Sequence, residues 1–274
     1  MGTPEAFGER EHALFMERGY LRLGRVLDDD GLEALRRRID DIMLGRVRYP
    51  HMRFQLDPQA GGGGGMRRMA SHEVATLDYR RIDDLEQDPL FLAHMQRPLF
   101  RRITRRYIGE AAAVFRSMFM NKPAGLGTEL GWHQDVGAGW KIDRNPFVTV
   151  WTALDAATAD SGCMQIVPGS NRHGVINEGH FVAEEEMRRY AGAGDVVDLE
   201  VGAGEAVLLH NLLLHRSGTN STGAPRRAFS CTYMEADTRS VITGETFPLV
   251  FGPAAPDPAS VPHKTAGRIA VFHG

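Results

Sequence analysis

Three side chains that commonly bind metals lie far apart in this sequence, and this separation constrains the fold more than any other feature. His133 and Asp135 are separated by a single residue in the stretch GWHQD. On an extended segment this spacing points both side chains to the same face. His215 follows Asp135 by 80 residues. Only a fold that brings distant segments of the chain together can place all three residues in one site.

The chemistry of these residues indicates a metal centre. Two imidazoles and one carboxylate on one face of a metal, with the other positions open, form the facial triad of non-haem Fe(II) oxygenases. Arg226 follows His215 by eleven residues, and its planar guanidinium suits a carboxylate bound at two points. A metal triad followed by a carboxylate-binding arginine predicts Fe(II) together with a keto-acid cosubstrate.

The first part of the chain is mostly helical in its pattern. Apolar side chains recur at helical spacing in residues 9–19, in residues 30–44 and in most of residues 73–110. Pro98 is expected to separate two helices. The stretch GYLRLGRVL, residues 19–27, alternates like a short strand. We expect the helices to pack on one face of a sheet.

From residue 114 the hydrophobic period changes to two, in short segments separated by Gly, Pro, Asn and Asp turns. Many short strands after a helical part indicate a double-sheet jelly roll. We therefore expect a single, mainly β domain over residues 1–274. It would have helices at about 1–110, a jelly-roll core at about 114–237 and a tail at 238–274.

Further segments lie around the HxD motif in a specific order. They are FMERGYLRLGRVLDDDGLEALRRRID (15–40), MFMNKPAG (118–125), WTALDAATADSGCMQIVPGSNRHG (151–174) and the HxSGxN stretch that begins at His215. HxD alone recurs by chance, but the whole series with its following arginine does not. The chain resembles the phytanoyl-CoA dioxygenase family of iron(II)/2-oxoglutarate dioxygenases.

This resemblance implies a cupin-like double-stranded β-helix and a definite set of site residues. His133, Asp135 and His215 match the positions that bind Fe(II), and Arg226 matches the partner of the distal carboxylate of 2-oxoglutarate. Three more residues match positions that contact this cosubstrate: Met118, Trp151 and Ser217. The implied reaction uses O2, releases succinate and CO2, and hydroxylates an unactivated C–H bond of a small organic molecule; a natural-product intermediate is one candidate substrate.

Two pairs of neighbouring residues compete for these roles. His210 and His215 both lie in EAVLLHNLLLHRSG, and the family pattern selects His215, so His210 is expected in the core or behind the ligands. Arg226 and Arg227 must point to opposite faces of one strand. The face of Arg226 carries small residues that leave room for a ligand, whereas the face of Arg227 carries packing residues. For Trp151, a cosubstrate contact and a plain core position are both open.

Other functions remain open at this point. The same iron centre supports desaturation, epoxidation or cyclisation, which differ only in where the substrate lies. A metal-binding jelly roll without turnover is a second alternative, since the fold alone would allow it. A zinc hydrolase is disfavoured, because no HExxH helix accompanies the ligands. The carboxylate of Asp135 favours oxidation over halogenation, since the related halogenases have a small residue there.

Composition excludes several classes of partner. The formal net charge is -3, from 32 basic and 35 acidic residues, which gives no electrostatic footprint for nucleic acid. No run of about 18 apolar residues is present, so no membrane span is expected. Two isolated cysteines do not make a disulfide framework, and the first 30 residues carry no secretory signal. We expect a cytoplasmic protein with a small-molecule substrate; its oligomeric state is left open.

Several loops are candidates for substrate contact. Residues 46–72 contain five consecutive glycines, Gly61–Gly65, and are expected to form a mobile loop that is either a plain surface loop or a lid. As part of a lid, Arg53 and Gln55 would reach the cosubstrate or substrate. Residues 175–194 are expected to be an insertion with a short helix at 183–190, and the tail is expected at the mouth of the site. The loop with Trp140, Lys141 and Arg144 is either a substrate contact or a surface loop.

Overall fold

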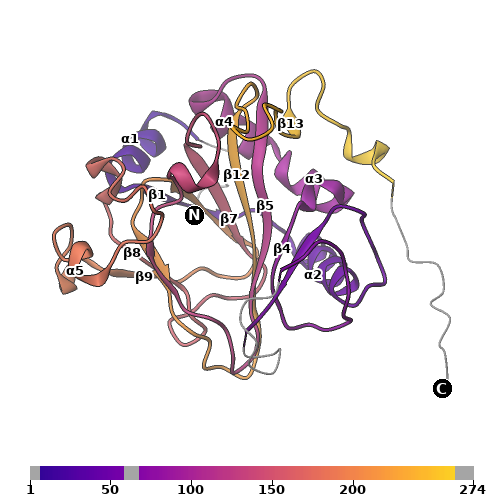
Figure 1. Cartoon of the computed structure of the whole chain (residues 1–274), viewed down its shortest axis with the longest axis horizontal. Coiled ribbons are helices and arrows are strands. Elements are labelled where there is room, and N and C mark those ends of the chain that lie inside the picture. Colours follow the sequence, from indigo (N-terminus) through magenta and orange to yellow (C-terminus); the bar gives the residue numbers. More distant parts are fainter. Residues whose placement is uncertain (1–6, 59–67, 263–274) are drawn as a thin grey trace.

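Two antiparallel β-sheets form the body of the protein (Figure 1). The computed structural model describes residues 7–58 and 68–262. Within these residues, a major sheet has nine strands and a minor sheet has four. The predicted jelly roll with helical cover is confirmed. In the same two stretches, none of the helices has the length and apolar character needed to cross a membrane.

The strand order brings together segments that are distant in sequence. The major sheet contains, in spatial order, β1 (Tyr20–Arg25), β10 (Glu205–His210), β7 (Val148–Ala153), β12 (Arg226–Glu235), β5 (Ala112–Lys122), β4 (Tyr79–Asp83), β2 (Arg53–Leu56) and β3 (Arg68–Met69), with β13 (Leu249–Phe251) beside β5. The minor sheet contains β6 (Leu130–His133), β11 (His215–Ser217), β8 (Met164–Ile166) and β9 (Val197–Leu199).

Helices cover the outer face of the major sheet. They are α1 (Glu9–Arg18), α2 (Asp29–Met43), α3 (Pro89–Met95) and α4 (Pro98–Tyr107), and a short α5 (Glu184–Met187) lies beside β8 and β9 (Figure 1). Asp28 caps α2 by accepting a hydrogen bond from Gly31 N at 2.9 Å. Pro98 occupies the first turn of α4, where a missing N–H costs nothing, and it separates α3 from α4 as predicted.

The region expected to be loop and helix also contributes strands. In the segment predicted as a loop, β2 and β3 pair with each other, and β2 pairs with β4, which was predicted to be helical. Phe54 and Ile82 are buried and sit opposite each other. These strands are too short to show a period of two, and their pairing is a tertiary effect. The Gly61–Gly65 stretch lies outside the described residues, so the proposed lid does too.

The sheet also crosses the expected divisions of the chain. The short strand predicted at residues 19–27 is present as β1, whereas β4 lies in the segment predicted to be mostly helical. β13 lies in the predicted tail, where it pairs with β5. The helix expected at 183–190 is shorter, at Glu184–Met187. The strands predicted after residue 114 are present as β5, β7, β8, β9, β10 and β12.

Alternation along the central strands creates two different faces. On the outer face, Phe119 of β5 and Phe229 and Tyr233 of β12 join a core shared with α2, α3 and α4. On the inner face, Trp151 and Ala228 pack with residues of β8 and β9 from the minor sheet. The space left between the two sheets, beyond this inner core, holds the candidate site.

Candidate active site

A cavity of about 570 Å³ opens between the two sheets. The major sheet supplies part of its wall from four strands: Met118, Met120, Trp151, Leu209, Arg226 and Ser230. The minor sheet supplies the opposite part: Leu130, His133, Met164, His215 and Ser217. The volume is in the range of small-molecule sites in enzymes. Its wall combines apolar side chains with several charged ones, most of them arginines.

The three predicted metal-binding residues lie together in this cavity. One ligand atom from each of His133, Asp135 and His215 lies within 4.8 Å of the other two. His133 ends β6 and sits directly opposite His215 of β11, with ring centroids 4.0 Å apart. Nε2 of His215 is 3.7 Å from Oδ2 of Asp135. Strand pairing therefore closes the gap of 80 residues in sequence.

Backbone carbonyls orient both imidazoles. Nδ1 of His133 is 2.8 Å from the carbonyl of Gly131, and Nδ1 of His215 is 2.9 Å from the carbonyl of Leu213. A carbonyl can only accept, so each Nδ1 donates its proton. Each Nε2 is then an unprotonated acceptor that faces the cavity. This is the tautomer that a histidine needs to bind a metal through Nε2.

Electrostatics favour a metal-ready protonation state. Burial lowers the pKa of His133 to about 3, so its ring is neutral at physiological pH. Burial opposes ionisation of Asp135, but the influence of His215 and His133 outweighs it and holds the pKa of Asp135 below its usual value. Two neutral imidazoles and one ionised carboxylate are the donor set that a divalent iron ion requires. The three residues therefore fit the ion that the sequence pattern predicts.

Arg226 lies in the same cavity with an unsatisfied guanidinium. It is 2% exposed, and Nη2 donates to the carbonyl of Gly162 at 2.8 Å, but its buried Nε has no hydrogen-bond partner. Among the described residues, no carboxylate lies within ion-pair distance of it. Lys122 sits directly opposite on β5, where burial, together with Arg226, lowers its pKa to about 7. A buried cation without an anion is costly, so this end of the cavity is complementary to a carboxylate.

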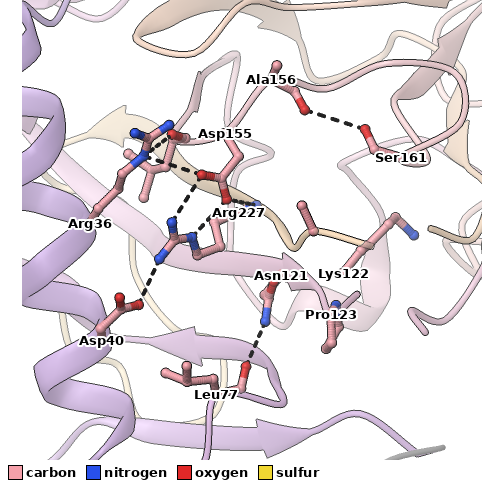
Figure 2. A network of polar contacts seen from close by, with 12 residues as sticks. Arg36, Asp40, Leu77, Asn121, Lys122, Pro123, Asp155, Ala156, Ser161 and Arg227 are labelled. Atoms are coloured by element: carbon pink, nitrogen blue, oxygen red, sulfur yellow. Dashed lines mark hydrogen bonds and ion pairs between the residues drawn. The ribbon is translucent and has the colours of Figure 1, made fainter. Parts of the chain in front are cut away.

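The neighbouring Arg227 has a structural environment instead. It points to the helix-covered face and pairs with Asp155 and with Asp40 of α2, each at 2.8 Å (Figure 2). The predicted opposite orientation of the two arginines is correct. His210, the rival of His215, is buried against Phe15 and lies outside the triad.

The structure separates the other predicted contacts. Met118, Trp151 and Ser217 line the cavity, as do Gln55 and Trp140. Lys141 is exposed and outside it, while Arg144 pairs with Glu235 and Asp237. Arg53 pairs with Asp84 at 2.7 Å and does not line the cavity. No part of the tail up to residue 262 contributes to the wall.

Arg116 and His180 are among the cavity residues that the sequence analysis did not identify. Arg116 precedes Met118 by two positions on β5, so strand alternation could have identified it. His180 lies in the insertion at residues 175–194, with its ring 5.0 Å from that of His133 and its buried Nδ1 without a partner. Nothing in the sequence around His180 indicates this position, which depends on an isolated bridge between His133 and Phe181.

Comparison with known proteins agrees with this geometry. The sequence profile of the family described as Phytanoyl-CoA dioxygenase (PhyH) matches residues 15–228. The peroxisomal phytanoyl-CoA dioxygenase of Rattus norvegicus is 24% identical over 241 residues, which are 84% of this chain and 69% of the rat protein. The phytanoyl-CoA dioxygenase of Arabidopsis thaliana is 23% identical over 264 residues, 86% of this chain and 92% of the plant protein.

Solved structures show the same fold. EctD from S. alaskensis with 2-oxoglutarate and 5-hydroxyectoine has a TM-score of 0.66 at 18% identity, covering 93% of this chain and 86% of EctD. EvdO2 from Micromonospora carbonacea var. aurantiaca, complexed with 2-oxoglutarate, has a TM-score of 0.61 at 22% identity, covering 88% of this chain and 95% of EvdO2. With the profile matching most of the sequence, the chain belongs to the phytanoyl-CoA dioxygenase family and is an iron(II)- and 2-oxoglutarate-dependent dioxygenase.

Proposed function

We propose that this dioxygenase hydroxylates an unactivated C–H bond of a small organic molecule. In this proposal His133, Asp135 and His215 hold the iron, and Arg226 binds the distal carboxylate of 2-oxoglutarate. The observation that carries it is the buried guanidinium of Arg226, which pairs with no acidic side chain in the described part of the chain and lies in the same cavity as the triad. A protein that only stored a metal would have no use for a second, carboxylate-binding centre beside it.

When bound, iron and 2-oxoglutarate together supply the oxidising chemistry: O2 is consumed, 2-oxoglutarate is converted to succinate and CO2, and one oxygen atom is left for the substrate. The protein has separate tasks. The carbonyls of Gly131 and Leu213 hold each Nε2 toward the metal position. Asp135 stays ionised, so it needs no deprotonation to bind a cation.

Further side chains set where the cosubstrate and substrate would lie. The ring of Trp151 lies 5.8 Å from Cζ of Arg226, measured to the ring centroid, and restricts the guanidinium on one side. Met118 lines the cavity from β5, and Ser217 supplies a hydroxyl from β11. We propose all three as cosubstrate contacts, with Ser217 donating a hydrogen bond to a carboxylate. The apolar remainder of the wall excludes water from the oxidation.

An anaerobic titration tests the assignment of these residues. Fe(II) followed by 2-oxoglutarate gives a visible charge-transfer band when the keto acid chelates the metal through two oxygen atoms. We expect the band in the wild type, its loss in His133→Ala, and a higher 2-oxoglutarate requirement in Arg226→Ala. A folded wild-type protein that binds iron but gives no band would show that the triad is not assembled as proposed.

Two further measurements separate the remaining alternatives. Release of succinate under O2 excludes a metal-binding module without turnover. The mass of the product then identifies the reaction, since hydroxylation adds one oxygen atom, whereas desaturation and cyclisation each remove two hydrogen atoms. Epoxidation adds the same mass as hydroxylation but consumes a double bond, which NMR of the product detects.

A further inference from the structure

Arg116 occupies the cavity face of β5 at the end away from Arg226. Arg116, Met118 and Met120 are alternate residues of the strand and point to the same face, and all three line the cavity. In the pairing of β5 with β12, Thr232 sits opposite Arg116, whereas Arg226 sits opposite Lys122. Six residues of strand correspond to roughly 20 Å. The cavity therefore has one arginine near each end of its floor.

An irregularity in β5 shapes the surroundings of Arg116. Thr232 pairs with Arg116 and Tyr233 pairs with Val114, so Phe115 is left without a partner, as in a β-bulge. This lets the consecutive side chains of Phe115 and Arg116 reach the same neighbour. The rings of Phe115 and Trp140 stack at 4.9 Å, and Cζ of Arg116 lies 4.2 Å from the centroid of Trp140.

The guanidinium of Arg116 thus rests on aromatic rings instead of on a carboxylate. Stacking engages the face of the guanidinium and leaves the N–H groups in its plane available. Among the described residues, none offers Arg116 an ion pair. Asp83, whose negative charge acts on Arg116, is already paired with Arg81 at 2.8 Å. Asp135, the second acid whose charge acts on Arg116, belongs to the triad.

Charges of both signs act on Arg116: Arg81 and Arg53 oppose its ionisation, whereas Asp135 and Asp83 favour it. Burial lowers the pKa of Arg116 to about 10, with a further contribution from Arg81, so the group remains protonated at neutral pH. The cost of holding this cation in a low-dielectric cavity is offset when an anion enters. Arg81 also lines the cavity, where it is paired with Asp83. This end therefore favours an anion that does not come from the protein.

We propose that Arg116 binds an oxyanionic group of the substrate, a carboxylate or a phosphate, at the end of the cavity opposite the cosubstrate arginine. The inference rests on the proposed function, because it takes Arg226 as the site of 2-oxoglutarate. The substrate is then a small anionic molecule. Its anion is held by the in-plane N–H groups of Arg116, with Trp140 fixing the orientation of the guanidinium. The bond to be oxidised lies between this anchor and the triad.

Binding of simple probes tests the inference without a known substrate. Calorimetric titrations use benzoate and phenyl phosphate as anions and benzyl alcohol as their neutral counterpart. They are made with iron(II) and 2-oxoglutarate bound, without O2, and repeated on the protein without either. We expect wild type to bind at least one anion tenfold or more tightly than the alcohol. The stronger of the two anions identifies the oxyanion as carboxylate or phosphate.

Variants then assign the preference to one residue. Arg116→Gln is expected to lose the tenfold preference while binding the alcohol as before, and Arg116→Lys is expected to keep part of it. Arg105→Gln is the matched control, because Arg105 is exposed on α4 and pairs only with Glu110 among the described residues. The control should bind all three probes like the wild type.

Specific outcomes would overturn the inference. Equal binding of anions and alcohol by the wild type would do so, and so would an anion preference that persists in Arg116→Gln. If Arg116 only braced Trp140, the variant would lose anion and alcohol binding alike. A failure of the proposed function is distinguishable, because it would abolish the charge-transfer band of the wild type while the titrations without iron and cosubstrate would still decide the role of Arg116.

Discussion

Two consecutive arginines on β12 lie on opposite faces of the sheet and in different environments. Arg227 faces the helices, where its guanidinium contacts both oxygens of Asp155 and also reaches Asp40, and Asp155 is shared with Arg36 (Figure 2). Arg226 faces the cavity, and its one hydrogen-bond partner among the residues described is the carbonyl of Gly162. The sequence shows the same residue twice. Their surroundings differ: Arg227 belongs to an ion-pair network within the protein, whereas Arg226 lies in the cavity that we propose as a binding site.

The comparison extends to the two faces of the whole sheet. On the helix-covered face, the Tyr233 hydroxyl donates a hydrogen bond to the carbonyl of Met95, although the buried Nδ1 of His94 on α3 has no partner among the described residues. On the cavity face, Arg226, Gln55 and His180 each keep a buried nitrogen without a partner. Unsatisfied groups reduce stability and are retained where a bound molecule will satisfy them.

The largest effect is expected from Arg226→Ala. If this guanidinium binds the distal carboxylate, its loss should weaken 2-oxoglutarate binding by about 3 kcal/mol, more than a hundredfold. The free energy of unfolding should change little or rise, because an unpaired buried charge is removed. Titration of the iron(II) protein and urea unfolding measure the two effects. Unchanged affinity for 2-oxoglutarate would contradict the assignment of Arg226.

Arg227→Ala should show the reverse pattern. Its removal leaves Asp155 and Asp40 without their strongest partner in a mostly buried place, so we expect a loss of about 2 kcal/mol in the free energy of unfolding. Binding of 2-oxoglutarate should stay within twofold of the wild type. A double-mutant cycle with Asp155→Ala isolates the coupling of the pair. If cosubstrate binding fell instead of stability, the two faces would not be functionally separate.

The helix-covered face also predicts a pH dependence. Burial, assisted by Arg97, lowers the pKa of His94 to about 3, whereas an unfolded histidine titrates near 6.5. Below that pH the unfolded chain binds a proton that the folded protein does not, so stability falls by about 1.4 kcal/mol per pH unit from this residue. His94→Leu should reduce the slope of unfolding free energy between pH 6 and pH 4 by about this amount. An unchanged slope would mean that His94 is charged in the folded protein.

The smallest effect is expected from Arg53→Gln. The side chain of Arg53 is 61% exposed and pairs with Asp84 outside the cavity, and exposed ion pairs contribute about 0.5 kcal/mol or less. Neither the charge-transfer band nor the affinity for 2-oxoglutarate should change. Gln55→Ala is the informative partner, because Gln55 lies on the same strand but lines the cavity. A clear effect of Arg53→Gln on cosubstrate binding would restore the role that the sequence suggested for it.

Much of the site was predictable because it depends on local patterns. The spacing of His133 and Asp135 sets two ligands near one another, and the parity of β12 distinguishes Arg226 from Arg227. The long strands and the helices with caps, such as α2, also follow from their own periodicity. Short segments were mispredicted. β2, β3 and β4 have too few residues to show the alternating pattern of a strand, and they form because β4 pairs with the edge of β5 and the other two follow.

By itself, the sequence determined the family, the three residues that we propose as metal ligands and the face of β12 on which Arg226 lies, since each depends on residue order or on alternation along one strand. Only the tertiary structure decided which cations have acidic partners. Arg227 and Arg53 are neutralised by residues from other segments, whereas Arg226 and Arg116 meet none among the residues described. Ion pairs depend on the distance between charged groups in three dimensions, and the order of residues alone does not give the distance between segments that are far apart in sequence.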